Sequence, residues 1–214
     1  MDSSGTEDAN RAYYDAFSAG YEAHRGDNDP GGYHDLLDEL ESEYVKRYGA
    51  GKDVLEVGCG TGLVLSRVRR FARSAKGVDL SPGMLSKARE CRAYDGLHED
   101  EITRFFAAHV ATFDVIASAD TLCYFGDLQL LARSARAALR RGGWIAFTVE
   151  CGDDVETYRL QPHGRYGHAR AYVEQVMAHA GFDVLQVALA VLRRELGSDV
   201  QGWVVCARAR AAPT

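Results

Sequence analysis

The chain has 214 residues, of which 46% are hydrophobic and 26% are charged, and this profile is typical of one globular domain with a sizeable core. The formal net charge of −6 disfavours non-specific binding to a phosphate backbone, so we expect no nucleic-acid partner. No apolar run approaches the ~20 residues that span a bilayer, and the polar, acidic stretch after Met1 does not resemble a secretory signal. We therefore expect a cytoplasmic protein with no membrane partner.

The five cysteines support the same compartment. Their number is odd and none forms a Cys-x-x-Cys pair, which argues against a disulfide framework and against a zinc site. Reduced thiols are the rule in the cytoplasm. We therefore expect free thiols and no bound metal.

Two helical segments are predicted before the first strand. Between residues 11 and 21, Tyr13, Phe17 and Tyr21 recur every four residues and share one face of a helix. Residues 32–48 carry an apolar stripe of leucines and tyrosines opposite a row of acids. A tyrosine hydroxyl needs a polar partner, so the first helix is predicted to be a lid over a binding site. The alternative is that its aromatic stripe is only core.

Six short runs rich in Val, Ile, Leu and Phe are predicted as strands, over residues 53–58, 75–80, 113–119, 143–150, 182–191 and 200–208. A seventh, weaker candidate lies near Leu97. Helical patterns fall between the early strands, at 62–73, 83–92 and 127–140. The alternation predicts an α/β three-layer sandwich with a mostly parallel, seven-stranded sheet. Only Glu195–Asp199 separate the last two strands, so these are expected to form an antiparallel hairpin.

The stretch Val54–Gly62 contains the most informative motif. A short apolar run ends at Gly58, Gly60 and Gly62, and an amphipathic stretch follows, which predicts a buried strand, a tight turn and a helix start. Glycines let the backbone approach a ligand closely. The spacing G-x-G-x-G, preceded by Glu56, differs from the G-x-G-x-x-G of dinucleotide-binding proteins. A nucleotide-like cofactor is the functional interpretation, and a plain strand-to-helix turn is the alternative.

The next predicted strand ends in the segment Gly77–Met84. This places Asp79 at the carboxyl end of the second strand. At that position a carboxylate can accept hydrogen bonds from both hydroxyls of a ribose. The glycine turn and Asp79 therefore predict one shared cofactor site.

Glu56–Gly62 and Gly77–Met84 resemble two motifs of the class I S-adenosylmethionine-dependent methyltransferases, and the resemblance extends over nearly the whole chain. The segment Ser118–Leu128 is similar to a subgroup also found fused to tetratricopeptide repeats, and no such repeats occur here. The resemblance implies a Rossmann-like domain over residues 51–214, preceded by a helical lid segment over residues 1–50.

The resemblance and the aromatic helix together predict a set of cofactor-binding residues: Tyr14, Tyr21, Glu56, Gly58, Gly60, Asp79, Leu80, Met84, Glu101, Ile102 and Ala119. The resemblance implies that Gly58 and Gly60 approach the methionine part of the cofactor and that Asp79 binds the ribose. It implies that Met84 lies against adenine and that Glu101 accepts from the adenine amine. Core packing is the alternative for Met84, and a solvated helix start is the alternative for Glu101.

Asp120 follows the fourth predicted strand and is a candidate catalytic residue. Ligands bind at the carboxyl ends of parallel strands. Asp120 could orient the amino end of the cofactor, bind a substrate amine or act as a general base. It could instead only cap the helix that follows.

The segment Pro162–Arg170 contains two histidines, a tyrosine and two arginines, which suit substrate binding. Either His163 or His168 could take a proton from the methyl acceptor. The alternative is a polar surface loop that ends in a helix N-cap.

The function implied is an in-line transfer of a methyl group from S-adenosylmethionine, which leaves S-adenosylhomocysteine. The negative charge and the absence of a DPPY-like signature argue against DNA, so a small-molecule acceptor methylated on nitrogen or oxygen is expected. Three alternatives stay open: a nicotinamide-dependent oxidoreductase, a non-catalytic cofactor-binding module and a protein methyltransferase recruited by a partner. The oligomeric state is left open.

Overall fold

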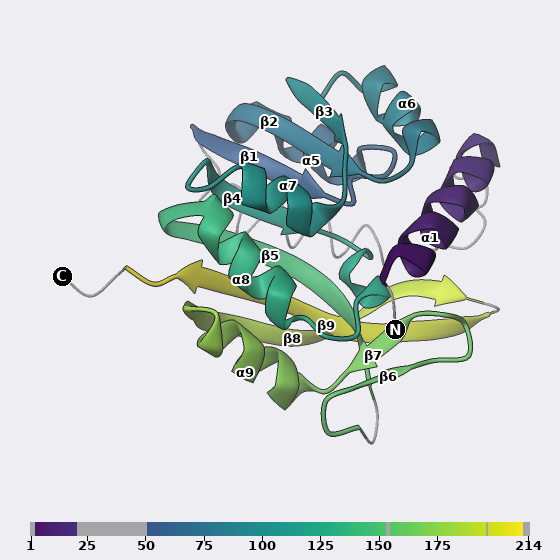
Figure 1. The fold of residues 1–214 in the computed structure, drawn as a ribbon, viewed down its shortest axis with the longest axis vertical. Coiled ribbons are helices and arrows are strands. Elements are labelled where there is room, and N and C mark those ends of the chain that lie inside the picture. The colour runs from purple at the N-terminus through teal and green to yellow at the C-terminus, as the bar shows by residue number, and fades with distance from the viewer. Residues whose placement is uncertain (1–2, 21–50, 153–154, 196, 212–214) are drawn as a thin grey trace.

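The computed structural model describes residues 3–20, 51–152, 155–195 and 197–211, and its core is one twisted sheet (Figure 1). Five parallel strands come first in the chain: β1 (Lys52–Val57), β2 (Ala72–Asp79), β3 (Gly96–Glu99), β4 (Phe113–Ser118) and β5 (Leu139–Cys151). They lie in the order β3-β2-β1-β4-β5, and every neighbouring pair is parallel.

The two C-terminal strands complete the sheet and form antiparallel pairs. β9 (Ser198–Ala209) runs antiparallel to β5, and β8 (Phe182–Glu195) pairs antiparallel with β9. Two short strands, β6 (Tyr158–Leu160) and β7 (Tyr166–His168), form a second hairpin, in which β7 runs parallel to the last residues of β5. The antiparallel pair of β8 and β9 confirms the C-terminal hairpin expected from the sequence.

The helices follow the predicted alternation: α1 (Ser3–Phe17), α5 (Leu63–Val68), α6 (Pro82–Glu90), α7 (Ile102–Ala108), α8 (Gln129–Ala138) and α9 (Arg170–His179). Three short 3-10 turns accompany them: η1 (Ser18–Gly20), η3 (Arg69–Phe71) and η4 (Leu122–Tyr124).

The two faces of the sheet bury separate cores. Leu55 of β1 packs in the cluster that contains Phe105 of α7 and Leu131 of α8. Its neighbour Val54 packs with Leu65 of α5 on the other face. This is the alternation of a strand buried on both sides. Figure 1 shows α7, α8 and α9 along one face, so the expected three-layer α/β sandwich is confirmed.

Some elements differ from the expectation. The weak candidate near Leu97 is a strand, β3. The segment 162–170, described from the sequence as a loop, contains the strand β7, and no strand is predicted where β6 lies. These two strands have three residues each, shorter than the four-residue runs from which a strand is read in a sequence. The first helix begins at Ser3 and ends at Phe17, earlier than predicted. The helix predicted over 32–48 lies outside the described residues.

Candidate functional site

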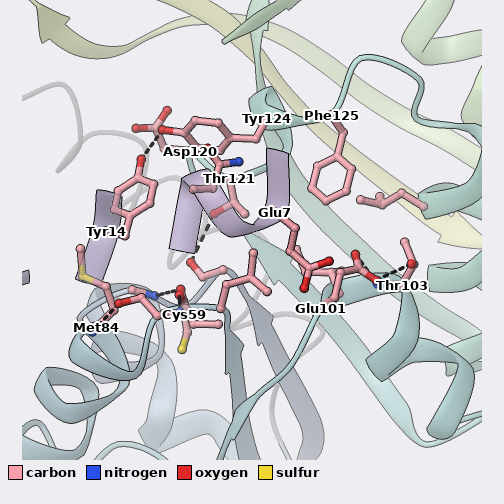
Figure 2. A pocket seen from close by; sticks show the side chains of 18 of the residues that line it. Glu7, Tyr14, Cys59, Met84, Glu101, Thr103, Asp120, Thr121, Tyr124 and Phe125 are labelled. Carbon is pink, nitrogen blue, oxygen red and sulfur yellow. Dashed lines mark hydrogen bonds between the residues drawn. The ribbon is translucent and has the colours of Figure 1, made fainter. Parts of the chain in front are cut away.

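A cavity of about 740 Å³ opens at the carboxyl ends of β1, β2 and β4, with α1 in front of it (Figure 2). This volume is within the usual range of small-molecule sites. Of the residues predicted from the sequence, those that line the cavity are Tyr14, Glu56, Gly58, Gly60, Asp79, Leu80, Met84, Glu101, Ile102, Ala119 and Asp120. The structure thus gathers most of the predicted site around one space.

The glycine turn between β1 and α5 needs its glycines for two different reasons. Gly58 has φ +63°, and a Cβ there would overlap the side chain of Thr121. Gly60 has φ +52°, and a Cβ there would meet nothing within 4 Å, so only the left-handed backbone restricts this position. The turn is therefore packed against Thr121 on one side and open at Gly60, which lines the cavity.

Asp79 ties the end of β2 to this turn. Its carboxylate accepts hydrogen bonds from the backbone N–H of Gly60, at 2.8 Å, and of Ser81, at 2.9 Å. Burial raises the pKa of Asp79, and these two backbone donors act in the opposite direction. A carboxylate has about four acceptor positions, so the Asp79 oxygens can accept further bonds from a ligand.

Glu56 caps the N-terminus of α5, where the N-cap residue Gly62 has no side chain to do so. Glu56 Oε2 accepts from the N–H of Leu65 at 3.0 Å. The Tyr94 hydroxyl donates to the same oxygen at 2.7 Å. Glu56 is 3% exposed, and this burial raises its pKa to about 8. Its geometry is that of a residue that positions the glycine turn.

The side of the cavity expected to face adenine is built from two helix starts. Met84 is buried in the first turn of α6, where Ser81 caps the helix by accepting from the Met84 N–H at 3.1 Å. Glu101 caps α7, with Oε1 accepting from Thr103 and Oε2 from Arg104, both at 2.9 Å. Both carboxylate oxygens of Glu101 therefore serve the helix, and its expected contact with an adenine amine stays a prediction.

Asp120 lies where β4 ends and has the uncommon φ of +52° for a residue other than glycine. Its N–H donates to Thr148 Oγ1 at 2.8 Å, and its Oδ1 accepts from Arg193 at 2.6 Å. Burial raises the pKa of Asp120, and the positive charge of Arg193 opposes that shift. The next helical turn, η4, is preceded by Thr121 and has no side-chain cap, so Asp120 is not a helix cap.

A network of charges that the sequence did not indicate stands behind Asp120. Arg193 of β8 also donates to Glu150 and Glu195, and Arg165 donates to Glu195 at 3.0 Å. Glu150, at the end of β5, is 3% exposed. A buried carboxylate requires a partner, so Glu150 at the end of an apolar strand was the available signal. Its hydrogen-bond partner Arg193 lies 43 positions away in the sequence.

The two candidate histidines have different surroundings. His163 Nε2 lies 3.4 Å from Glu150, and the His163 side chain is 37% exposed. His168 is fully buried on β7, where its Nε2 contacts the carbonyl oxygens of Phe125, at 2.9 Å, and Gly126, at 3.1 Å. Burial lowers the pKa of His168. Neither histidine is among the residues that line the cavity, and the expected role of either one as a proton acceptor stays a prediction.

Helix α1 covers the cavity through polar contacts. The hydroxyls of Tyr14 and Tyr124 are hydrogen-bonded, as Figure 2 shows, and burial raises the pKa of Tyr124 to about 12. Asp15 accepts from the Gly83 N–H at 2.7 Å. Tyr13 is 58% exposed, so the cavity-facing residue of the predicted aromatic helix is Tyr14. Tyr21 lies outside the described residues.

Known proteins match both this fold and this sequence. A family model described as a methyltransferase domain matches residues 30–187, about three quarters of the chain. The chain belongs to the methyltransferase domain family. The resemblance to class I S-adenosylmethionine-dependent methyltransferases expected from the sequence is therefore confirmed, and so is S-adenosylmethionine as the cofactor. That the glycine turn holds this cofactor stays a prediction.

Curated relatives of this methyltransferase include two ubiquinone biosynthesis O-methyltransferases. The protein of Actinobacillus pleuropneumoniae is 29% identical over 125 residues, which cover 53% of this chain and 53% of that protein. The protein of Thiobacillus denitrificans is 30% identical over 156 residues, which cover 71% of this chain and 66% of that protein. The methyltransferase thus spans about half to two thirds of the length of these relatives.

Among solved structures, magnesium protoporphyrin IX methyltransferase from Synechocystis PCC 6803, with bound SAH, shares the fold of this methyltransferase. The TM-score is 0.73 over 95% of this chain and 99% of that chain, at 15% identity. At this identity the likeness concerns the fold alone.

One group of side chains in the described part of the methyltransferase has the spacing of metal ligands. One ligand atom each from Asp120, Cys123 and Glu150 lies within 4.8 Å of the others. Arg193 donates to both of these carboxylates, so a guanidinium cation already balances their charge. The expectation of no bound metal stays a prediction. Among the described helices, none has the length and apolar composition needed to cross a membrane.

Proposed function

We propose that this methyltransferase transfers the methyl group of S-adenosylmethionine to a hydroxyl oxygen of a small-molecule acceptor. The observation that carries the proposal is that one cavity joins the glycine turn and Asp79, on one side, to the half-buried carboxylate of Asp120 on the other. The curated relatives named O-methyltransferases support oxygen, rather than nitrogen, as the methylated atom.

The residues of the cavity fit the cofactor by charge and by shape. Six acids line it, of which Glu56, with its pKa of about 8, is mostly protonated at neutral pH, and Arg104 is the basic residue among its lining. The acids that are ionised favour the positively charged sulfonium. The open side of Gly60 leaves room for a ligand close to the backbone. When bound, S-adenosylmethionine supplies the methyl group: the C–S bond breaks with its electron pair left on sulfur, and the acceptor oxygen forms the new C–O bond.

The chain's own part in the reaction is to position the acceptor, exclude water and receive a proton. Asp120 is the candidate to receive the hydroxyl proton, because burial moves its pKa toward the working pH and Arg193 fixes its Oδ1. Helix α1, held at Tyr14 and Asp15, excludes water. His163 acts through Glu150 as a positioning residue.

The cofactor assignment is tested by calorimetric titration with S-adenosylhomocysteine. Asp79→Asn removes the charge next to the expected ribose site and should weaken binding by roughly tenfold. Asp183→Asn, on the exposed start of β8, is the matched control and should bind like the parent protein. Equal affinity in all three proteins would overturn the assignment.

The acceptor class is tested with labelled S-adenosylmethionine and a panel of phenols, aliphatic alcohols and amines. Transfer to a hydroxyl compound supports the proposal, whereas transfer only to amines assigns N-methylation. Binding of the cofactor without transfer to any compound favours a binding module. Label that appears only on protein in a lysate favours a protein methyltransferase.

A further inference from the structure

Two tyrosine hydroxyls meet at the wall of the cavity, close to Asp120. Tyr14 of α1 and Tyr124 of η4 both line the cavity, and their hydroxyls are hydrogen-bonded to each other (Figure 2). Burial raises the pKa of Tyr14 and raises that of Tyr124 to about 12, and the negative charge of Asp120 adds to both shifts. Both phenols are therefore neutral at physiological pH, and the carboxylate of Asp120 lies near them.

Arg165, directly before β7, ties this pair to the charge network behind Asp120. Its Nε donates to the Tyr124 hydroxyl at 3.0 Å, and its Nη1 donates to Glu195 at 3.0 Å. The Arg165 side chain is 16% exposed, and its guanidinium carbon lies 5.7 Å from the centre of the Tyr124 ring. A guanidinium has donors only, so the Tyr124 oxygen is always the acceptor in this bond. These contacts fix the position of the Tyr124 hydroxyl.

The pair keeps one O–H that the described residues do not use. Two phenols carry two hydroxyl protons, and one of these lies in the bond between Tyr14 and Tyr124. In the part of the chain that the structure describes, neither hydroxyl donates to any other acceptor. Because both tyrosines line the cavity, the second O–H can donate to a ligand.

Asp120 offers the complementary acceptor. Among the described residues, Arg193 donates to it at 2.6 Å and the Cys123 thiol at 3.9 Å, and both bonds reach Oδ1. The Asp120 side chain is 22% exposed and lines the cavity. The second oxygen, Oδ2, therefore stays an acceptor for a ligand. This end of the cavity thus combines one phenolic donor with one carboxylate acceptor.

A donor beside an acceptor fits an oxygen nucleophile better than a nitrogen nucleophile. A hydroxyl group donates its proton to the carboxylate, accepts from the phenol with one lone pair and keeps the other lone pair for the methyl carbon. A neutral amine has a single lone pair, and a hydrogen bond from the phenol would occupy the pair that must attack. The arrangement therefore selects for oxygen through its hydrogen bonds.

We propose that the phenol pair of Tyr14 and Tyr124 stabilises the oxyanion of the acceptor as Asp120 receives the proton, and that Arg165 is the positioning residue of this pair. The acceptor's O–H bond breaks, its proton moves to Oδ2 of Asp120, and its electron pair stays on oxygen. A preorganised donor aimed at this developing charge lowers the barrier. The oxygen then forms the C–O bond as the C–S bond breaks and leaves its electron pair on sulfur.

The inference rests on the proposed function, and it adds the groups that select oxygen and stabilise its charge. Its test imitates the state after proton transfer and needs no turnover. Asp120→Asn places a neutral side chain where the protonated carboxyl would be, and asparagine tolerates the positive φ of this position. The probe is 4-nitrophenolate, whose visible absorbance distinguishes it from 4-nitrophenol. It is titrated with and without saturating S-adenosylhomocysteine.

The first comparison is between Asp120→Asn and the parent protein. Asp120→Asn should bind 4-nitrophenolate at least about tenfold more tightly, because the carboxylate of Asp120 repels the anion in the parent protein. Asparagine keeps the shape of aspartate, and Arg193 keeps its hydrogen bonds to Glu150 and Glu195, so the variant should fold.

Two double substitutions in the Asp120→Asn background locate the donor. Tyr14→Phe with Tyr124→Phe removes both hydroxyls and keeps both rings, and it should weaken phenolate binding by about tenfold, because a hydrogen bond to an anion is lost. Tyr13→Phe with Tyr158→Phe is the matched control, since these tyrosines are 58% and 37% exposed and neither lines the cavity. The control should bind like Asp120→Asn alone.

Arg165→Lys tests whether Arg165 acts through the phenols. Lysine keeps the positive charge but loses the rigid fork that donates to Tyr124. In the Asp120→Asn background it should weaken phenolate binding several-fold. Once Tyr14 and Tyr124 are phenylalanines it should change the affinity by less than about twofold, because no hydroxyl is left to position.

The results separate the two proposals. If S-adenosylhomocysteine binds to none of these proteins, the proposed function fails, and the phenolate titrations without it still decide the inference. The inference is overturned if Asp120→Asn does not bind 4-nitrophenolate more tightly than the parent protein, or if loss of both hydroxyls leaves its affinity unchanged. It is also overturned if Arg165→Lys has the same effect with and without the two hydroxyls.

Discussion

The two halves of the cavity differ in how far apart their residues lie along the chain. The half next to the glycine turn comes from Glu56–Gly62, Asp79–Met84 and Glu101–Ile102, three segments that each lie at the carboxyl end of a parallel strand. The half around Asp120 combines α1, the segment 120–127 and β7. The residues of the first half can therefore be recognised in the sequence as local motifs. Those of the second half come together only when the chain folds.

The two halves also differ in what holds them in place. In the cofactor half, backbone N–H groups bind carboxylates, as Gly60 and Ser81 bind Asp79. In the acceptor half, side chains bind other side chains, as Arg193 binds Asp120 and Glu150. A backbone donor is present whatever the residue is, but a guanidinium is lost with one substitution. Loss of the shared guanidinium of Arg193 should therefore have a large effect on the acceptor half.

The largest expected effect is that of Arg193→Met. The change leaves the carboxylates of Asp120 and Glu150 without their shared partner, which should lower the free energy of unfolding by about 3 kcal/mol. Arg194→Met is the control, because the neighbouring Arg194 pairs with Asp199 and both side chains are about half exposed. It should cost under about 1 kcal/mol in urea unfolding. Similar losses in the two variants would show that the network does not hold the acceptor half together.

The same variant has a predicted pH dependence. Burial already raises the pKa of Asp120, and without the charge of Arg193 this pKa should rise further. A group whose pKa is raised by folding stabilises the protein below its unfolded pKa, and that contribution is lost as the pH rises through the folded pKa. The deficit of Arg193→Met should therefore be smaller near about pH 4 than near about pH 7. A deficit that does not change with pH would contradict this account.

The next effect concerns the glycine turn, where Gly58→Ala combines two costs. Alanine at φ +63° is strained, and its Cβ would overlap Thr121, so the free energy of unfolding should fall by about 3 kcal/mol. Gly51→Ala is the matched control, with φ +65° and nothing within 4 Å of the added Cβ, and should cost about 1 kcal/mol.

A second substitution separates strain from overlap at Gly58. Thr121→Ala removes the side chain that the new Cβ would meet, so the double variant should recover the difference between Gly58→Ala and Gly51→Ala. If Thr121→Ala and Gly58→Ala are simply additive in thermal unfolding, the turn is not packed against Thr121 as described.

A smaller effect, again in the cofactor half, should appear in the pH dependence of Glu56. Folding raises its pKa to about 8, so the stabilisation is complete at acidic pH and is lost as the pH rises toward that value. The free energy of unfolding of the parent protein should fall by about 1 kcal/mol per pH unit in this window, relative to Glu56→Gln. If the free energy of unfolding changes with pH in the same way in both proteins, Glu56 does not ionise in this pH window.

The difference between the halves explains what the sequence could predict. The order of strands and helices, the C-terminal hairpin and the placement of Asp79 followed from apolar runs and glycines in short windows. The contact between the rings of Tyr158 and Tyr166 did not, because these residues are brought together only by a turn between two three-residue strands. The ion pair of Arg193 with Asp120 joins residues 73 positions apart, and no spacing rule connects them.

The smallest predicted effect tests whether α1 belongs to the acceptor half as a cover. Asp15 accepts from Gly83 N–H and from Ser81 Oγ at the start of α6, so Asp15→Ala should cost about 1 kcal/mol of stability. Asp8→Ala, on an exposed turn of the same helix, should cost less than half as much. If α1 covers the cavity, Asp15→Ala should also speed the release of S-adenosylhomocysteine several-fold in stopped-flow measurements, because loosening one end of the helix gives the ligand an exit. An unchanged release rate together with the loss of stability would make α1 a structural helix that only packs against the start of α6.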